Sequence, residues 1–500
     1  MSDNISETES YVVIGAGPVG IVISNLLLEL GKRVILTEAG DFNTESKLLS
    51  RNSYEFRRES KIPESVHLVG GGSTQWHGRV GQFTISDFLK NSSRYQEWPY
   101  DFSTMDKYFK KVFELVLNDS TLDLDFLNSQ PFLQEIRKEL PTCLDFRLYR
   151  FSNLQIYNEL LDKSLLNDNF TLKTNFFCNE ISSLSDSTYK MEYIDSVGKK
   201  SMVHSKNIII ACGTLQSTAL LLRSNSIKFP AKSNFLGHGL MEHFDGFVGS
   251  LLIKKQNNKV LNSLSLTSDR KLQNQNYGIG LSLQSNELIK NGFPNIHLEI
   301  TKFKKKFLFE RRTYVLNISL ATRDFLYLME RVIRKILDPF LIIYDKIMRQ
   351  KRYSVWIKGE EFSNHDSFLS LSELIDKNGI RKLKYNHEIS DLTSSKVREE
   401  LKYFSQRLSE FNLGVFRPYR HLMAKRLKFY VGPNWHPMGS TVMGINPLSS
   451  VCDTNLEVHE NKNLYLLNAG IFPTGSNQNP TAMVLAQAFK LADHLRSNNS

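Results

Sequence analysis

Residues 11–40 of this chain read YVVIGAGPVGIVISNLLLELGKRVILTEAG. An apolar strand at 11–14 leads into a glycine-rich turn and a helix, and a second apolar strand at 34–37 ends at Glu38. The helical part carries apolar residues at helical spacing, and Gly31 ends it. A strand, a helix and a second strand in this order are typical of a parallel α/β sheet. The segment therefore predicts a doubly wound α/β domain.

The turn in this segment has the spacing of a nucleotide-binding loop. Gly15 allows the tight turn, Gly17 lets the backbone approach a pyrophosphate, and Gly20 permits close packing of helix on strand. Pro18 suits the first helical turn, where its missing N–H costs nothing. The helix N-terminus attracts phosphates, and Glu38 is placed to accept hydrogen bonds from ribose hydroxyls. These residues predict a nucleotide site without distinguishing NAD from FAD, although Glu38 disfavours the 2′-phosphate of NADP.

The composition is that of a soluble globular protein with more than one core. The chain has 500 residues, of which 41% are hydrophobic and 23% charged, and this length predicts two or more structural domains. The opening MSDNISETES lacks the basic and apolar regions of a secretion signal. Four scattered cysteines, with no CxxC pair or His/Cys cluster, indicate a reducing compartment and no metal site. We therefore expect a cytoplasmic protein.

The net charge of +11 is concentrated in one segment. Between Lys302 and Arg352 there are fourteen Lys and Arg against five Asp and Glu, which gives 14 − 5 = +9. Apolar residues recur at helical spacing near 322–352, with a break at Pro339, and the run is too short and too charged to span a bilayer. Such a helix can contact a membrane or an acidic partner, or bury its apolar stripe in its own domain. Nothing resembles a nucleic-acid recognition module, so we expect no nucleic-acid partner.

A histidine near the C-terminus sits in a restricted stretch. Residues 434–444 read NWHPMGSTVMG, and Pro437 biases His436 toward an extended conformation. His436 can be a packed loop histidine or an acid–base group. The stretch alone leaves both interpretations open.

Further motifs follow the glycine loop in a fixed order. They are VGGGSTQWHGRVGQFTISDF at 69–88, EWPYDFSTMDKYF at 97–109, IIIACGTLQSTALLLRS at 208–224, NFLGHGLMEHFDG at 234–246, and HPMGSTVMG, SSVCDTNLEVHENKNLYLLNAGIFP and NQNPTAMVLAQAFKLADHL within 436–495. With the opening fingerprint, the sequence resembles the glucose-methanol-choline (GMC) family of flavin-dependent oxidoreductases, most closely its bacterial sugar- and polyol-oxidising branches. The resemblance covers about residues 10–110, 170–250 and 430–497, and residues 250–430 match no motif that we can name.

The resemblance implies a discontinuous domain organisation. An FAD-binding, Rossmann-like domain would comprise residues 1–80, 155–250 and 430–500. An inserted α+β cap or substrate-binding domain would comprise 81–154 and 251–429, with the basic amphipathic helix near 322–352.

The resemblance also implies FAD as the cofactor. The residues that it places at the cofactor lie in glycine loops, at strand ends and at helix starts: Gly15, Gly17, Pro18, Gly20, Glu38, Gly71, Gly72, Ser73, Thr74, Cys178, Ala211, Gly213, Asn468, Ala469, Pro480 and Thr481. Ser73 and Thr74 can hydrogen-bond a phosphate or the flavin edge, although an ordinary Ser/Thr turn explains them equally. The family often has Asp where this chain has Asn468, so one cofactor contact is expected to differ. Members with covalent flavin have histidine at the position of Gln75, so we expect non-covalent FAD.

The catalytic pair implied by the resemblance is His436 and Asn479. His436 would be the base, and Asn479 would hold the substrate oxygen, while hydride passes to flavin N5. Asn479 also suits a helix N-cap and Pro480 the first helical position, and capping alone would explain both. The family's HPxGT becomes HPMGS, in which Ser440 keeps the hydroxyl.

The expected reaction is oxidation of a CH–OH group in a sugar, polyol or other polar alcohol, with an unidentified electron acceptor. One alternative is a lyase that uses the same flavin fold without net redox. A second is a peripheral membrane or partner-binding protein with vestigial catalysis, in which the basic helix matters most.

Overall fold

The computed structural model describes residues 4–6, 9–44, 46, 54–56, 66–117, 129–153, 155–185, 188–230, 235–254, 270–272, 275–302, 340, 343–376, 378–420, 422–424 and 436–497. Most of the basic segment, including 303–339 and 341–342, lies outside these residues. The predicted helix near 322–352 can therefore be compared with the structure only from residue 340 onward.

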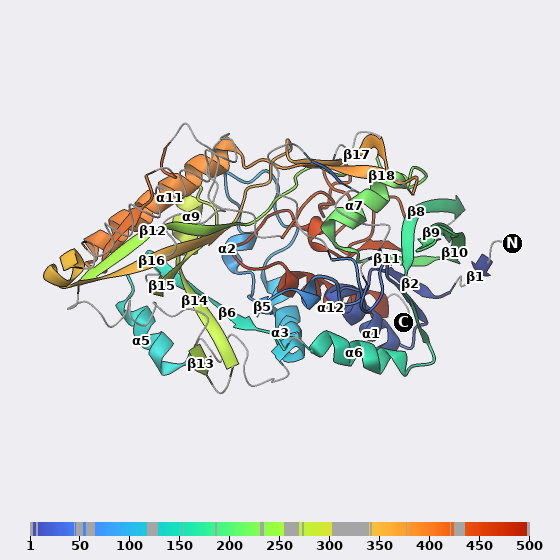
Figure 1. Ribbon diagram of the computed structural model, residues 1–500, viewed down its shortest axis with the longest axis horizontal. Helices are drawn as coiled ribbons and strands as arrows, with labels where there is room; N and C mark the ends of the chain where they lie inside the picture. The colour runs from blue at the N-terminus through green and yellow to red at the C-terminus, as the bar shows by residue number, and fades with distance from the viewer. Residues whose placement is uncertain are drawn as a thin grey trace.

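A five-stranded parallel sheet forms one half of the molecule (Figure 1). Its strands, in the order β20-β11-β2-β3-β7, are β20 (Leu464–Leu466), β11 (Asn207–Ile210), β2 (Tyr11–Ile14), β3 (Val34–Thr37) and β7 (Phe170–Lys173). β2, β3 and β20 are buried along their whole length, as expected for short apolar strands covered on both faces. The sheet joins segments from both ends and the middle of the chain.

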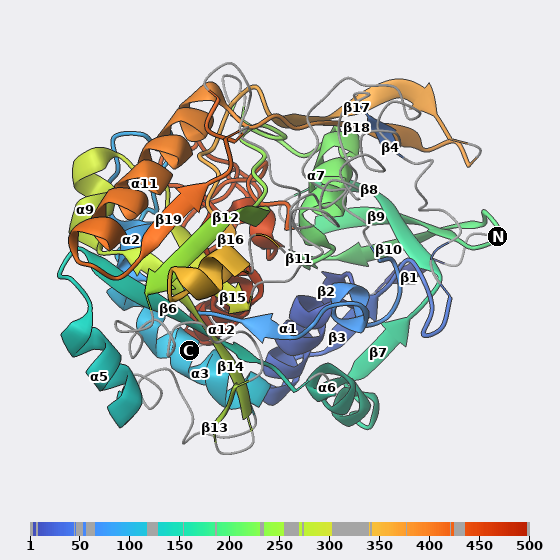
Figure 2. The same ribbon diagram turned by 60° about the vertical axis from the view of Figure 1, so that its left-hand side comes forward.

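Helices and a smaller sheet cover this parallel sheet. The helices are α1 (Pro18–Glu29), α3 (Ser103–Leu117), α6 (Ile156–Leu165), α7 (Gly213–Arg223) and α12 (Thr481–Ser497). The smaller sheet has the order β1-β10-β9-β8, with β1 (Asn4–Ser6), β8 (Phe176–Ser185), β9 (Thr188–Asp195) and β10 (Lys200–Ser205). α1 and α6 lie on one side, and α7 with β8 to β10 on the other (Figures 1 and 2). The predicted α/β class is confirmed.

An antiparallel eight-stranded sheet forms the other half (Figure 2). Its order is β19-β12-β16-β15-β14-β6-β5, with β13 beside β14. The strands are β5 (Arg79–Val80), β6 (Leu144–Phe151), β12 (Phe244–Lys254), β13 (Arg270–Leu272), β14 (Gln275–Leu283), β15 (Ile296–Lys302), β16 (Gln350–Gly359) and β19 (Val415–Pro418). Along β15 and β16, apolar and polar residues alternate, so the sheet has one apolar and one polar face.

The apolar face packs in a core of its own. α11 (Asp391–Glu410) contributes Val397, Leu401, Phe404 and Leu408 to this core, which also takes in side chains of β12, β15 and β16. Ser390 caps α11 by accepting a hydrogen bond from the Thr393 N–H. Shorter helices flank the sheet: α2 (Ile85–Phe88), α5 (Pro131–Glu139) and α9 (Ser285–Asn291).

A third, three-stranded sheet lies beside α7. It has the order β17-β18-β4, with β4 (Tyr54–Phe56), β17 (Phe368–Ile375) and β18 (Arg381–Asn386). Leu369 and Leu383 share a small core with Leu215 of α7. No helix within the described part of the chain has the length and apolar composition that spanning a bilayer requires.

The packing shows which predicted segments share a core. α3 packs against α12 in the core of the parallel sheet, although it lies within 81–154. β12 joins the antiparallel sheet from Phe244 onward. If domains are divided by the core that their residues share, residues 103–117 belong with the proposed FAD-binding domain and not with the cap domain. The domain boundaries therefore stay a proposal.

Candidate active site

The first glycine loop is shaped by contacts with its own fold. Gly15 has a φ of 107°, and a Cβ there would lie 2.6 Å from the Cα of Cys212. A Cβ on Gly20 would overlap the carbonyl oxygen of Gly15. A Cβ on Gly17, in contrast, would meet no heavy atom within 4 Å. Pro18 is the first residue of α1, as predicted. Gly17 is thus the one of these three glycines that faces open space.

The second glycine loop lies against the first. The Gly70 N–H donates to the Ala16 carbonyl at 2.8 Å, and a Cβ on Gly71 would lie 3.1 Å from the Cα of Gly17. Gly71 to Thr74 form the short 3-10 helix η2 (Gly71–Thr74). The hydroxyls of Ser73 and Thr74 donate to the Gly70 and Gly71 carbonyls at 2.7 and 2.8 Å, which is the Ser/Thr-turn alternative.

Glu38 is buried at the end of β3. The Ala16 N–H donates to its Oε2 at 2.9 Å, and the Gly40 N–H donates to its Oε1 at 3.2 Å. Burial raises the pKa of Glu38, and these backbone hydrogen bonds oppose the rise. A carboxylate oxygen can accept more than one hydrogen bond, so Glu38 keeps acceptor capacity for a ligand.

A third segment approaches the first loop from β11. The Ala211 N–H donates to the Ile14 carbonyl at 2.8 Å, and Gly213, with a φ of 73°, begins α7. A Cβ on Gly213 would meet no heavy atom within 4 Å. Cys178 of β8 is buried. Burial raises the pKa of Cys178.

Asn468 lies at the start of η4 (Ala469–Ile471), the segment that contains the predicted Ala469. Its Oδ1 accepts the Gly470 N–H at 2.7 Å, so asparagine here acts as a cap. Its buried Nδ2 and the buried Oγ1 of Thr441 have no hydrogen-bond partner among the described residues.

The His436 loop is held on both sides by backbone hydrogen bonds. Met438 and Met241 exchange N–H to carbonyl bonds of 2.9 Å, and the Thr441 N–H donates to the Gly470 carbonyl at 3.0 Å. The Thr214 hydroxyl donates to the Pro437 carbonyl at 2.7 Å. Ser440, with a φ of 73°, lies 2.8 Å from the Thr218 hydroxyl. Three other sequence motifs, those that contain Thr214, Met241 and Gly470, therefore fix the position of the His436 loop.

The imidazole of His436 is half-buried and lies near two cationic side chains, Lys358 and Arg79. The His436 N–H donates to Oε2 of Glu242 at 3.0 Å, and its ring makes an edge contact with His243, with centroids 5.4 Å apart. Its buried Nδ1 has no hydrogen-bond partner among the described residues. Burial lowers the pKa of His436 well below 6.5, and the positive charges of Lys358 and Arg79 lower it further. The ring is therefore neutral at neutral pH.

Asn479 meets Lys358 of the antiparallel sheet. The Lys358 ammonium donates to Oδ1 of Asn479, and Nδ2 of Asn479 donates to the Arg79 carbonyl at 3.3 Å. The predicted cap is therefore wrong: α12 begins at Thr481, one residue after Pro480, and the Asn479 side chain bonds to other elements. The bond from the Val484 N–H to the Pro480 carbonyl makes Pro480 the cap position.

The polar face of the antiparallel sheet supplies residues that sequence reasoning missed. Arg79 forms an ion pair with Glu299 at 2.7 Å and lies 3.0 Å from Nε2 of His297. Lys358 is fully buried, and burial lowers its pKa to about 7. Burial also raises the pKa of Asp245 to about 6.

These missed residues did leave a signal in the sequence. IHLEITK and RYSVWIKG place His297, Glu299 and Lys358 at alternate positions between apolar residues. That alternation predicts half-buried strands, but it does not show that the polar side meets His436 and Asn479.

The loops around the first glycine turn fit a dinucleotide such as FAD. Gly17, Gly72 and Gly213 come from three adjacent segments, and none would meet a heavy atom within 4 Å of a Cβ. This leaves bare backbone where a pyrophosphate approaches a helix N-terminus. The unpartnered Asn468 Nδ2 and Thr441 Oγ1 provide polar atoms for a ligand.

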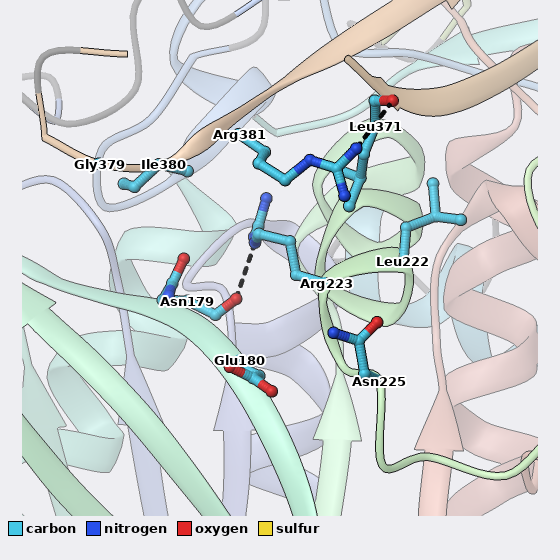
Figure 3. A pocket seen from close by; sticks show the side chains of 9 residues that line it. All are labelled: Asn179, Glu180, Leu222, Arg223, Asn225, Leu371, Gly379, Ile380 and Arg381. Atoms are coloured by element: carbon cyan, nitrogen blue, oxygen red, sulfur yellow. Dashed lines mark hydrogen bonds between the residues drawn. The ribbon is translucent and has the colours of Figure 1, made fainter. Parts of the chain in front are cut away.

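A separate cavity of about 180 Å³ lies at the other end of α7 (Figure 3). Arg223 and Arg381 extend toward it from α7 and β18. None of the predicted site residues lines this cavity, although two residues of β8 do.

Comparison with known proteins agrees with this geometry. The family model described as GMC oxidoreductase matches residues 399–488. No curated protein matches the sequence.

Solved structures share the fold over almost the whole chain. Pyridoxine 4-oxidase from Mesorbium loti has a TM-score of 0.57 at 16% identity, covering 97% of this chain and 98% of its own. A formate oxidase of Aspergillus oryzae RIB40, studied for a mutation that affects FAD modification, has a TM-score of 0.60 at 14% identity, with 100% and 99% covered. A fungal aryl-alcohol oxidase has a TM-score of 0.58 at 12% identity, with 99% and 100% covered.

Identities this low establish the shared fold, while the family model adds a sequence match in the segment that carries His436 and Asn479. The predicted resemblance to the GMC oxidoreductase family is thereby confirmed for residues 399–488, and the chain as a whole shares the fold of these solved oxidases.

Proposed function

We propose that this protein oxidises the CH–OH group of a small polar alcohol, with non-covalent FAD and with His436 as the base. The observation that carries the proposal is the placement of His436 and Asn479 around one buried cation. Lys358 donates a hydrogen bond to Asn479 and lowers the pKa of His436.

The cofactor would be held by the two glycine loops, by Glu38 and by the Gly213 turn. FAD, when bound, supplies an acceptor for hydride from a carbon atom. Non-covalent binding is supported by Gln75, which is exposed and has an amide where covalently flavinylated relatives have an imidazole. Cys178, which the resemblance also places at the cofactor, is buried in β8.

His436 would take the proton of the substrate hydroxyl. A neutral imidazole accepts a proton without first losing one. The positive charges of Lys358 and Arg79, which disfavour an imidazolium, would stabilise an alkoxide in the same place. The electrostatics thus favour negative charge on the substrate oxygen.

Asn479 would act as a hydrogen-bond donor to the substrate oxygen. Its Oδ1 is occupied by the Lys358 ammonium, which fixes the orientation of the amide. One hydrogen of Nδ2 goes to the Arg79 carbonyl, and the second is left for the substrate. Lys358 would therefore position Asn479.

The substrate class is proposed to be a sugar, polyol or related polar alcohol. The polar sheet face offers donors and acceptors in Arg79, Glu299 and Lys358. The solved relatives are named for pyridoxine, formate and aryl alcohols, which fits a family that varies its substrate on one fold.

The test first screens a panel of alcohols and sugars for anaerobic reduction of the bound flavin. Rapid mixing of the protein with a substrate found in this way then measures the rate of flavin reduction. His436→Ala should slow flavin reduction by about 10²–10⁴-fold, because a positioned base contributes about that factor. FAD content should not change, because the glycine loops hold the cofactor. The matched control is His365→Ala, which removes an exposed histidine that is distant from His436 in the sequence.

Reduction by His436→Ala at the parental rate would show that this histidine is a packing residue. Turnover of a substrate without any bleaching of the flavin would favour the lyase alternative.

A further inference from the structure

Five large apolar side chains form an exposed ridge at the end of the basic segment. Phe340, Ile343, Tyr344, Ile347 and Met348 are each between 50% and 72% exposed. We call these five residues the apolar ridge. Single exposed apolar residues are common on protein surfaces, but contiguous ones mark an interaction site.

Within the apolar ridge, Ile343, Tyr344 and Ile347 lie on the short helix 343–347, and Met348 directly follows it. Their spacing by three and four positions places them on one side of this helix. This short helix lies where β16 begins, at the tip of the antiparallel sheet (Figures 1 and 2). An amphipathic helix in a globular protein normally turns its apolar face to the core, whereas this one turns it to solvent.

Exposed cations flank the apolar ridge. Lys346, Arg349 and Lys351 are exposed, and none of them forms an ion pair with another residue that the structure describes. Asp345, the acidic residue among them, is bound by Arg352 through two hydrogen bonds of 2.9 Å. The surface around the ridge therefore carries net positive charge.

We propose that the apolar ridge docks on an anionic lipid surface. The five apolar side chains would enter the boundary between headgroups and acyl chains, and the three cations would contact lipid phosphates. Apolar burial and electrostatic attraction act together in such a contact, and each is weak alone.

Charge complementarity favours lipid over a second copy of this chain. A symmetric dimer through the ridge would bring Lys346, Arg349 and Lys351 close to the same residues of the other copy. Like charges at such an interface are unfavourable, while an anionic surface neutralises all three.

The experiment is flotation of the FAD-loaded full chain with two kinds of vesicle. One contains phosphatidylcholine alone, and the other phosphatidylcholine with phosphatidylglycerol. Binding should require phosphatidylglycerol and should weaken as salt rises, because salt screens the attraction. This measurement does not depend on substrate turnover, so its outcome is separate from that of the proposed reaction.

Two variants isolate the two contributions. Ile343→Ser with Ile347→Ser should weaken vesicle binding by about tenfold or more, through loss of apolar burial. Lys346→Gln should weaken binding by about fivefold, because each cation near the surface contributes about that much. The matched controls are Leu166→Ser and Lys402→Gln, which change an exposed leucine and an exposed lysine on other elements.

Absence of binding to anionic vesicles, or equal loss with the control variants, would overturn the proposal. So would a concentration-dependent dimer in sedimentation that the double serine variant dissociates, since a second copy would then cover the ridge.

Discussion

Lys358 connects the two proposed catalytic residues, because it bonds Asn479 and lowers the pKa of His436. Lys358→Met removes both effects. We expect the acidic limb of the pH profile of flavin reduction to move to higher pH, since the pKa of His436 rises once the cation is gone. The rate at the optimum should fall by about 10- to 100-fold, because a hydrogen bond to a charged group is lost.

Lys358→Arg is the companion variant, since it keeps the positive charge. Its acidic limb should stay near that of the parent even if the rate falls. An unshifted limb in Lys358→Met would mean that Lys358 does not act on His436.

Glu242 anchors the backbone of His436 and titrates in an unusual range. Burial raises the pKa of Glu242 from 4.5 to about 7, with the charge of His387 and the His436 N–H opposing the rise. The folded protein therefore holds a proton that the unfolded chain releases above about pH 4.5. This contribution to stability is complete below 4.5 and is lost as the pH rises through 7.

Glu242→Gln keeps a carbonyl acceptor for the His436 N–H but does not titrate. Thermal midpoints of parent and variant, measured from pH 4.5 to above 7, should show the parent losing stability relative to the variant. A difference that is constant with pH would contradict the raised pKa.

At the scale of elements, the β2–α1–β3 unit contains one glycine that the fold requires, Gly20, and one that a bound ligand would require, Gly17. Gly17→Ala adds a methyl group to open space at a φ of −76°, so the free energy of unfolding of the apoprotein should not fall. FAD affinity should fall by about tenfold or more, because the methyl group stands where backbone approaches the pyrophosphate.

Gly20→Ala is the matched contrast within the same helix. Its methyl group would overlap the Gly15 carbonyl, so the apoprotein itself should be destabilised by about 1–3 kcal/mol. Urea unfolding and FAD titration of both variants check the pair, and equal apoprotein stabilities would refute the distinction.

At the scale of the whole molecule, FAD would join segments that are distant in sequence. The cradle combines residues near 15–20, 70–74, 211–213 and 468–470, so removal of the cofactor should loosen all four. Dialysis against a chaotropic salt should release the FAD, since Gln75 offers no covalent linkage. The apoprotein should melt at a lower temperature, and FAD at about 100 times its Kd should restore about 2.7 kcal/mol of stability.

Recovery of the holoprotein melting temperature on addition of FAD is the measurement. Flavin that stays with the protein after denaturation would instead show a covalent bond.

Local patterns in the sequence predicted the N-terminal unit closely. β2, α1 and β3 occupy the predicted residues, with Pro18 at the start of α1 and Gly31 in a left-handed conformation after it. These features depend on neighbours within a few residues, so periodicity and capping preferences suffice to predict them.

Asn479 shows where local reasoning failed. Its side chain suited a cap, but the Lys358 ammonium, which lies 121 residues earlier in the chain, occupies its oxygen. A buried ammonium needs an acceptor, and that requirement outweighs the gain from one cap.

The sequence by itself determined the α/β class, and it predicted a glycine loop with nucleotide-site spacing and the resemblance to the GMC family, because each depends on contiguous residues with fixed spacing. Only the tertiary structure decided which side of the antiparallel sheet faces His436, that Lys358 and Arg79 lower the pKa of His436, and that the apolar ridge is exposed. Charge interactions and burial depend on distance in space, and residues that meet there are separated by long stretches of chain.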